Sequence, residues 1–155
     1  MLKRILVLAA AGLLSTAAFA QSQSQSQLQV SDPWIRATVP AQKATGAFMQ
    51  LKAAKATRLL AASTPAAGRV EIHQMEMQGQ TMRMHAVDGI DLPAGQAVNL
   101  ASGGYHIMLL DLKRQLKEGE QVPMTLTLQG ADGKRDSVNL TVPVKPLAYS
   151  VQGGH

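Results

Sequence analysis

Short segments rich in Val, Ile, Leu and Thr recur along the chain between clusters of turn-forming residues. Apolar and polar positions alternate in them, and no window keeps the period of an amphipathic helix. This pattern predicts β-strands, although Ala53–Thr57 and Lys113–Glu118 each have room for a helical turn. The predicted strands are Leu28–Thr38, Gly46–Ala53, Arg58–Ala62, Arg69–Met77, Thr81–Val87, Ala97–Ala101, Tyr105–Leu112, Val122–Gln129 and Ser137–Val144.

The segments between these strands carry turn signals. Gln78-Gly79-Gln80 predicts a tight hairpin, and Ala131-Asp132-Gly133-Lys134 predicts a second hairpin near the end of the chain. Further turns are expected at Pro93-Ala94-Gly95 and Ser102-Gly103-Gly104. Many short strands separated by regular turns are typical of an all-β fold, and we predict an antiparallel β-sandwich or barrel.

The N-terminus has the pattern of a cleavable secretory signal. Lys3 and Arg4 precede an apolar run, and the small-residue motif Ala18-Phe19-Ala20 follows it. The run is shorter than the roughly 20 apolar residues of a spanning helix, so we expect periplasmic export without stable membrane insertion. We assign residues 1–20 to the signal peptide, 21–27 to a flexible Gln/Ser leader, 28–149 to one domain and 150–155 to a short C-terminal tail.

The composition argues against several classes of function. The chain has no cysteine, so we expect no disulfide, no thiolate zinc site and no lipid-modified cysteine. Its formal charge of +5 falls to +3 without Lys3 and Arg4, the other basic residues are scattered, and aromatic residues make up 3%. Nucleic acid is therefore not an expected partner. No nucleophile elbow, phosphate loop or His-Glu-x-x-His motif occurs, so we expect no enzymatic activity.

Methionine is concentrated around the hairpin predicted at residues 78–80. Four of the eight methionines lie within ten residues there: Met75, Met77, Met82 and Met84. Successive side chains of a strand point to opposite faces, so His73 and Met75 share one face of their strand. His106 and Met108 share a face of a later strand for the same reason. Two strands therefore each present a His-x-Met pair on one face.

The chemistry of these donors selects a metal. Thioether sulfur is soft and uncharged and favours Cu(I), whereas zinc prefers thiolate, imidazole or carboxylate, and calcium and magnesium prefer oxygen. A mixed imidazole and thioether set binds a d¹⁰ ion without adding charge. A blue-copper electron-transfer centre needs a cysteine thiolate, which this chain lacks. The pattern therefore predicts Cu(I) as cargo.

The spacing of His73, Met84 and His106-x-Met108 resembles the H-x10-M-x21-H-x-M signature of the periplasmic copper-A chaperone family, the PCuAC-type proteins. Asp32–Thr38 and Lys43–Met49 also resemble the opening strands of that family. The resemblance implies a cupredoxin-like antiparallel β-sandwich or Greek-key barrel. It also implies a Cu(I) site made of His73, Met84, His106 and Met108.

The same resemblance implies delivery of copper towards the copper-A centre of cytochrome c oxidase. The expected partners are the copper-A subunit of the oxidase and a thioredoxin-like copper chaperone. Many members carry a longer C-terminal extension rich in His and Met that is associated with Cu(II), and here only residues 151–155 stand in its place. Cu(II) is therefore at most a weaker second cargo.

Several alternatives remain open from the sequence. Met75 is either an auxiliary sulfur ligand or plain packing, Met77 and Met82 are expected at the rim or in the core, and His85 is expected on the opposite face from Met84. The same site would serve periplasmic copper buffering or resistance. A metal-free β-sandwich that binds proteins through adaptable methionines is a third possibility. We expect a monomer or a weak, metal-dependent dimer.

Overall fold

The computed structural model describes residues 27–150, and the signal peptide and most of the leader and tail predicted above lie outside this range. Within it the chain forms ten strands and no helix. The strands are β1 (Leu28–Arg36), β2 (Ala44–Ala53), β3 (Thr57–Ser63), β4 (Ala67–Gln78), β5 (Thr81–Ala86), β6 (Ile90–Leu92), β7 (Ala97–Leu100), β8 (Tyr105–Leu112), β9 (Gln121–Gly130) and β10 (Arg135–Lys145). No helix in these residues is long and apolar enough to cross a membrane.

All nine predicted strands are present, with ends shifted by a few residues. The alternating pattern missed β6, because a strand of three residues is too short to show a period. Neither Ala53–Thr57 nor Lys113–Glu118 contains a helical turn. The all-β prediction is confirmed.

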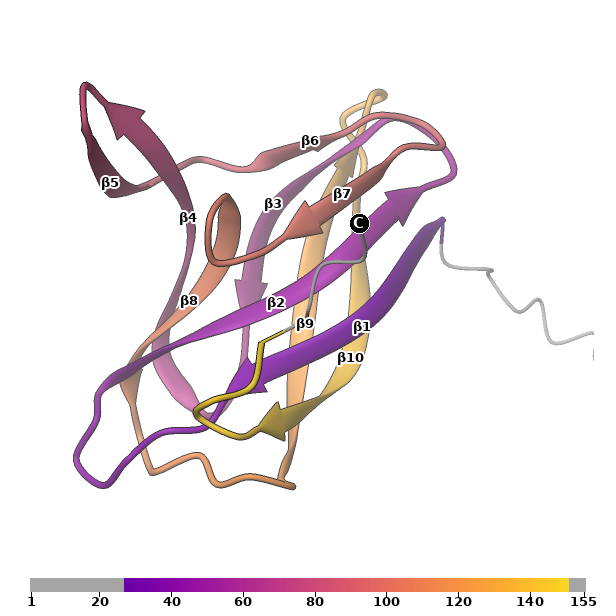
Figure 1. Ribbon diagram of the computed structural model, residues 1–155. Coiled ribbons are helices and arrows are strands. Elements are labelled where there is room, and N and C mark those ends of the chain that lie inside the picture. Colours follow the sequence, from indigo (N-terminus) through magenta and orange to yellow (C-terminus); the bar gives the residue numbers. More distant parts are fainter. Residues whose placement is uncertain (1–26, 151–155) are drawn as a thin grey trace, which may run out of the picture.

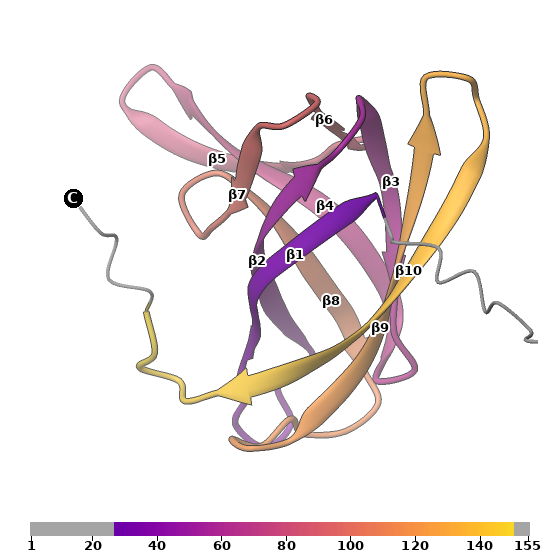
Figure 2. The same cartoon turned by 90° about the vertical axis from the view of Figure 1, so that its right-hand side faces the viewer.

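The strands form two layers that meet along one edge, as Figures 1 and 2 show. The first layer has the order β5-β4-β8-β2-β1, with β7 also paired to β2, and the second has the order β10-β9-β3-β6. Nearly all neighbours are antiparallel. The exception is β1, which joins β10 in parallel through Ile35 opposite Val144 and Arg36 opposite Lys145.

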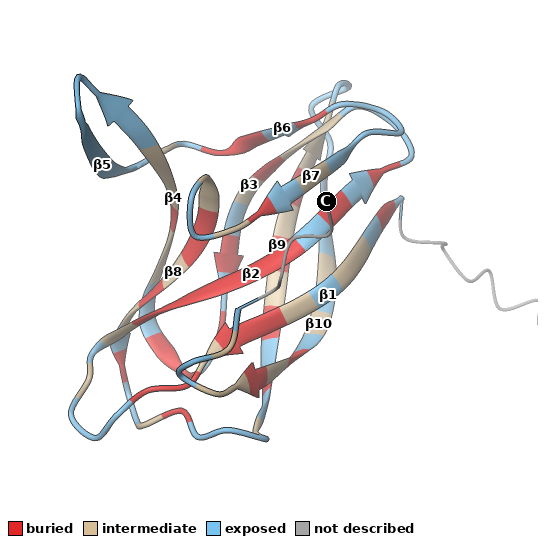
Figure 3. Cartoon of the chain, viewed as in Figure 1, coloured by how far each residue is buried: buried red, intermediate tan, exposed pale blue. Residues whose placement is uncertain are grey.

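Aliphatic side chains between the layers form a single core. In Figure 3, β2 is mostly buried and β5 is exposed throughout. Among the fully buried residues are Ile35, Leu51, Leu59, Ile107 and Leu126. Met49 and Met124 are core residues, each 2% exposed. Burial of apolar surface on the inner faces leaves the outer faces free to carry polar chemistry.

The β4–β5 hairpin extends beyond the body of the sandwich (Figures 1 and 2). All six residues of β5 are exposed, and β4 is its neighbour in the sheet. The turn between them is Gly79-Gln80, where Gly79 has a φ of 64°. This left-handed conformation carries no steric cost for glycine, and the tight hairpin predicted here is confirmed.

Candidate metal centre

The two histidines of the predicted site face each other across the first layer. The antiparallel register of β4 and β8 places His73 directly opposite His106, and their ring centroids are 5.9 Å apart. One position along, Ile72 lies opposite Ile107, and both are buried in the core. Because strand side chains alternate, the isoleucine pair on the inner face requires the histidine pair to lie on the outer face.

Glu71 orients the His73 ring. The Nε2 atom of His73 lies 2.7 Å from Glu71 Oε2, and Arg69 Nη1 lies 3.1 Å from the other carboxylate oxygen. The hydrogen bond from His73 is the main cause that lowers the pKa of Glu71, so the carboxylate is ionised and can only accept. Nε2 must then carry the proton. When the His73 ring is neutral, its lone pair is on Nδ1, which is buried and has no hydrogen-bond partner.

His106 presents its other ring nitrogen. Its Nδ1 lies 3.3 Å from the Gly104 carbonyl oxygen, so Nδ1 donates and the lone pair is on Nε2. Nε2 lies 3.2 Å from Met84 Sδ. Burial lowers the pKa of His106, and the hydrogen bond to Gly104 opposes this shift. A lowered pKa favours the neutral imidazole, which is the form that binds metals.

The methionines of the predicted site lie around this histidine pair on the same outer face. Met84 is 49% exposed, and Met75 is directly opposite it in the register of β4 and β5. Met108 is half-buried, follows His106 by two positions and lies opposite Glu71. The structure therefore brings His73, Met84 and His106 together from three strands, and it places Met108 and Met75 beside them. His85 lies on the other face of β5, as expected, and is exposed.

An aromatic cluster borders His106 on the side of β1 and β2. Phe48 has its ring centroid 6.2 Å from that of His106 and 4.5 Å from that of Trp34, and Arg36 lies 5.2 Å from the Trp34 ring. Asp32, at a φ of 49°, belongs to a bulge that brings Trp34 opposite Phe48. A Cβ on Gly46 would lie 2.6 Å from the Phe48 ring, so glycine makes room for this ring.

Sequence reasoning missed Glu71, Gly46 and Phe48 as parts of the site. Alternation along β4 is a signal that could have found Glu71, because it precedes His73 by two positions and so shares its face. Phe48 gave no such signal, because its neighbour His106 is distant in the sequence.

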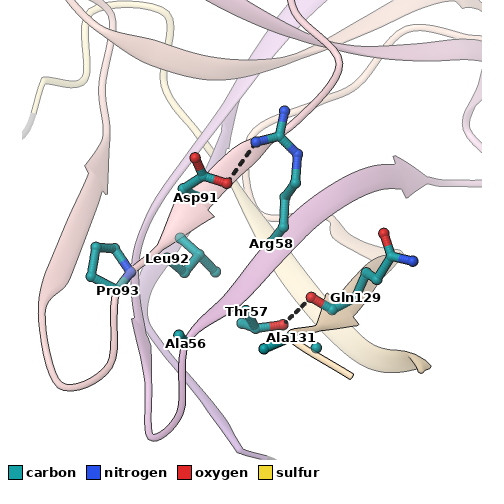
Figure 4. A pocket seen from close by; sticks show the side chains of 9 residues that line it. Ala56, Thr57, Arg58, Asp91, Leu92, Pro93, Gln129 and Ala131 are labelled. Carbon is teal, nitrogen blue, oxygen red and sulfur yellow. Dashed lines mark hydrogen bonds and ion pairs between the residues drawn. The ribbon is translucent and has the colours of Figure 1, made fainter. Parts of the chain in front are cut away.

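A separate hollow of about 320 Å³ lies on the second layer, between β3, β6 and the end of β9 (Figure 4). Its polar groups already have partners, since Arg58 Nη1 lies 2.6 Å from Asp91 Oδ1 and Thr57 Oγ1 donates to the Gln129 carbonyl oxygen. No histidine or methionine lines it. It therefore offers none of the donors predicted for copper.

The donors at the histidine pair are the unpartnered Nδ1 of His73, the Nε2 of His106 in contact with Met84 Sδ, and the neighbouring thioether sulfurs. Within residues 27–150, no group of three or more His, Cys, Asp or Glu side chains is placed to hold a metal. A donor set of imidazole and thioether fits a soft monovalent cation such as Cu(I).

The profile of a family described as putative lipoprotein LpqE-like matches residues 28–144. The chain belongs to the LpqE-like family. Putative lipoprotein Lxx21020 of Leifsonia xyli subsp. xyli (strain CTCB07) is 30% identical over 122 residues, which are 78% of this LpqE-like chain and 71% of that protein.

Solved structures similar to this LpqE-like protein include domains of the PCuAC type. The copper-bound PCuAC domain from PmoF2 has a TM-score of 0.61 at 23% identity and covers 77% of this chain and 93% of its own. Apo-DR1885 from Deinococcus radiodurans has a TM-score of 0.57 at 27% identity, over 94% of this chain and 97% of its own. The Cu(I) form of DR1885 has a TM-score of 0.52 at 31% identity, over 83% of each chain. The predicted resemblance to PCuAC-type domains and the predicted cupredoxin-like fold are confirmed.

Proposed function

We propose that this protein is a periplasmic copper chaperone that binds one Cu(I) through His73, Met84, His106 and Met108. The observation that carries the proposal is the contact of 3.2 Å between His106 Nε2 and Met84 Sδ, beside a His73 ring whose Nδ1 has no partner. Copper-bound structures of PmoF2 and DR1885, which share this fold, support the choice of metal.

The donors suit the binding and release of Cu(I) as cargo. Two neutral imidazoles and two thioethers leave the single positive charge of Cu(I) on the complex and require no deprotonation of a thiol. Met84 is 49% exposed, so one sulfur ligand is open to an incoming ligand of an acceptor protein. The His73 side chain, which is 12% exposed, and the buried His106 would hold the ion while Met84 is replaced. Such a site suits a protein that carries Cu(I) and passes it to an acceptor by exchange of ligands.

We infer the destination of the copper from the resemblance of the His73, Met84 and His106-x-Met108 spacing to the PCuAC-type signature. That resemblance suggests the copper-A centre of cytochrome c oxidase, reached directly or through a thioredoxin-like copper chaperone, as the acceptor. Copper buffering would use the same donors. The two functions differ in whether Cu(I) leaves the protein when an acceptor is offered.

An anaerobic titration with Cu(I), in competition with a chromophoric Cu(I) chelator, tests this proposal. We expect the mature protein to bind one equivalent tightly and to transfer it to an added copper-free copper-A domain. A protein that binds no stoichiometric Cu(I) would be a metal-free interaction module. Tight binding without transfer would favour copper buffering.

Glu71 is expected to set the affinity of this site without binding the metal. Glu71→Ala removes the acceptor that keeps the proton on His73 Nε2, and loss of such a partner typically weakens metal binding about 10–100-fold. Glu71→Gln retains an oxygen acceptor and is expected to restore most of the affinity. The competition titration measures both variants, and nitrogen-detected NMR of apo protein reports the tautomer of His73.

Glu76→Ala is the matched control for this prediction. Glu76 lies on the same strand but on the opposite face, opposite Arg83, and is exposed. Its removal should leave both the affinity and the tautomer of His73 unchanged. Equal affinities of the Glu71→Ala and Glu76→Ala variants would show that Glu71 does not position the ring.

A further inference from the structure

The β4–β5 hairpin has one face made of thioethers. Its register pairs Met77 with Met82 and Met75 with Met84, so all four side chains lie on the same face. The next residue of β4 on that face is His73, which lies opposite His106 in β8. Sulfur donors therefore continue from the tip of the hairpin to the histidine pair in steps of two residues.

The opposite face of the hairpin is polar. Gln74 lies opposite His85, Glu76 opposite Arg83, and Gln78 opposite Thr81. The hairpin is thus amphipathic, but its apolar face is not packed into the core, because Met77 is 57% exposed and Met82 is 44% exposed. The methionines that do fill the core, Met49 and Met124, are each 2% exposed. Packing therefore does not explain the methionines of the hairpin.

The spacing of these side chains allows several sulfurs to reach one ion. Directly opposite residues of antiparallel strands have Cβ atoms about 4.5–5.5 Å apart. Residues two apart along a strand are separated by about 7 Å, because each residue rises roughly 3.4 Å. Methionine has three rotatable side-chain bonds and adapts to irregular geometry. Three thioethers from two neighbouring pairs can converge on one soft cation without movement of the backbone.

We propose that Met75, Met77 and Met82 form a second, weaker Cu(I) site that loads the site at His73 and His106. Met84 belongs to the face of both sites, so the ion passes from one to the other by exchange of one ligand for another. Copper remains Cu(I) throughout, and no electron or proton is transferred. An all-thioether site lacks imidazole donors and binds more weakly, so transfer towards the histidines is downhill.

This inference rests on the proposed function, because the loading site supplies the site at the histidine pair. The test is NMR of protein carrying ¹³C-labelled methionine methyl groups, titrated with Ag(I) as a redox-inert probe and with Cu(I) under anaerobic conditions. The first equivalent of metal is expected to shift the methyl signals of Met84 and Met108. Metal beyond the first equivalent is expected to shift Met75, Met77 and Met82.

The variant for this test is Met77→Leu with Met82→Leu, which keeps apolar side chains of similar size and removes two sulfurs. We expect loss of the second equivalent, slower loading from a Cu(I) chelator, and retention of the first. Gln78→Ala with Thr81→Ala is the matched control, because this pair lies on the polar face of the same hairpin. The control should keep both equivalents and the loading rate of the unmodified protein.

Two results would overturn the loading site. Either the methyl signals of Met77 and Met82 do not move beyond the first equivalent, or the leucine variant retains the second equivalent. Association of the hairpin with protein in the absence of any metal response would assign the methionine face to protein contact instead. Failure of the first equivalent to shift Met84 and Met108 is a separate outcome, which contradicts the proposed function.

Discussion

The double variant His106→Ala and Met108→Ala is expected to abolish high-affinity Cu(I) binding. His106 supplies the Nε2 atom, which lies 3.2 Å from Met84 Sδ, and Met108 lies on the same face two positions further along β8. In structural zinc sites about 10–16 kcal/mol is shared among four ligands, so the loss of two ligands costs about 5–8 kcal/mol. The expected weakening of the Cu(I) affinity is a factor of about 10⁴–10⁶.

The measurement is the anaerobic competition titration of the double variant against the unmodified protein. His85→Ala is the matched control, because His85 follows Met84 in the sequence but points to the other face of β5 and is exposed. The control should bind as the unmodified protein does. His106 also packs near Phe48, so a folded state of the double variant has to be verified by NMR before the titration. Unchanged affinity in a folded double variant would contradict the assignment of these ligands.

The second large effect is expected in the core directly beneath the site. Ile107 is fully buried opposite Ile72, and its substitution by alanine leaves a cavity between β4 and β8. Such substitutions lower the free energy of unfolding by about 2–5 kcal/mol. The total stability of a domain is only about 5–15 kcal/mol, so a large share would be lost. Ile107→Val, which removes one methylene, should cost about 0.5–1.5 kcal/mol.

Urea-induced unfolding measures these differences in the free energy of unfolding, provided that its slope against urea concentration is the same for all variants. Met108→Ala is a useful comparison, because Met108 is the next residue of β8 but is half-buried on the outer face. It should reduce stability less than Ile107→Ala does and should affect Cu(I) affinity more. Equal stabilities of the Ile107→Ala and Ile107→Val variants would show that Ile107 is not packed in the core as described.

The sequence by itself determined which residues share a face. Period-two alternation is a local property of a strand, so the pairing of His73 with Met75 and of His106 with Met108 on common faces followed from residue order alone. The tight turn at Gly79 was predictable for a similarly local reason, because glycine adopts the left-handed conformation that the turn requires. Nine of the ten strands were recognised in the same way.

The tertiary structure alone decided which faces meet. Strand pairing joins residues that are far apart in the sequence, so no local period shows that His73 lies opposite His106, or that Phe48 borders the site. The parallel contact of β1 with β10 and the three-residue strand β6 depend on the same long-range packing. The proton positions on the two histidines were also decided there, because Glu71 and the Gly104 carbonyl reach opposite ring nitrogens.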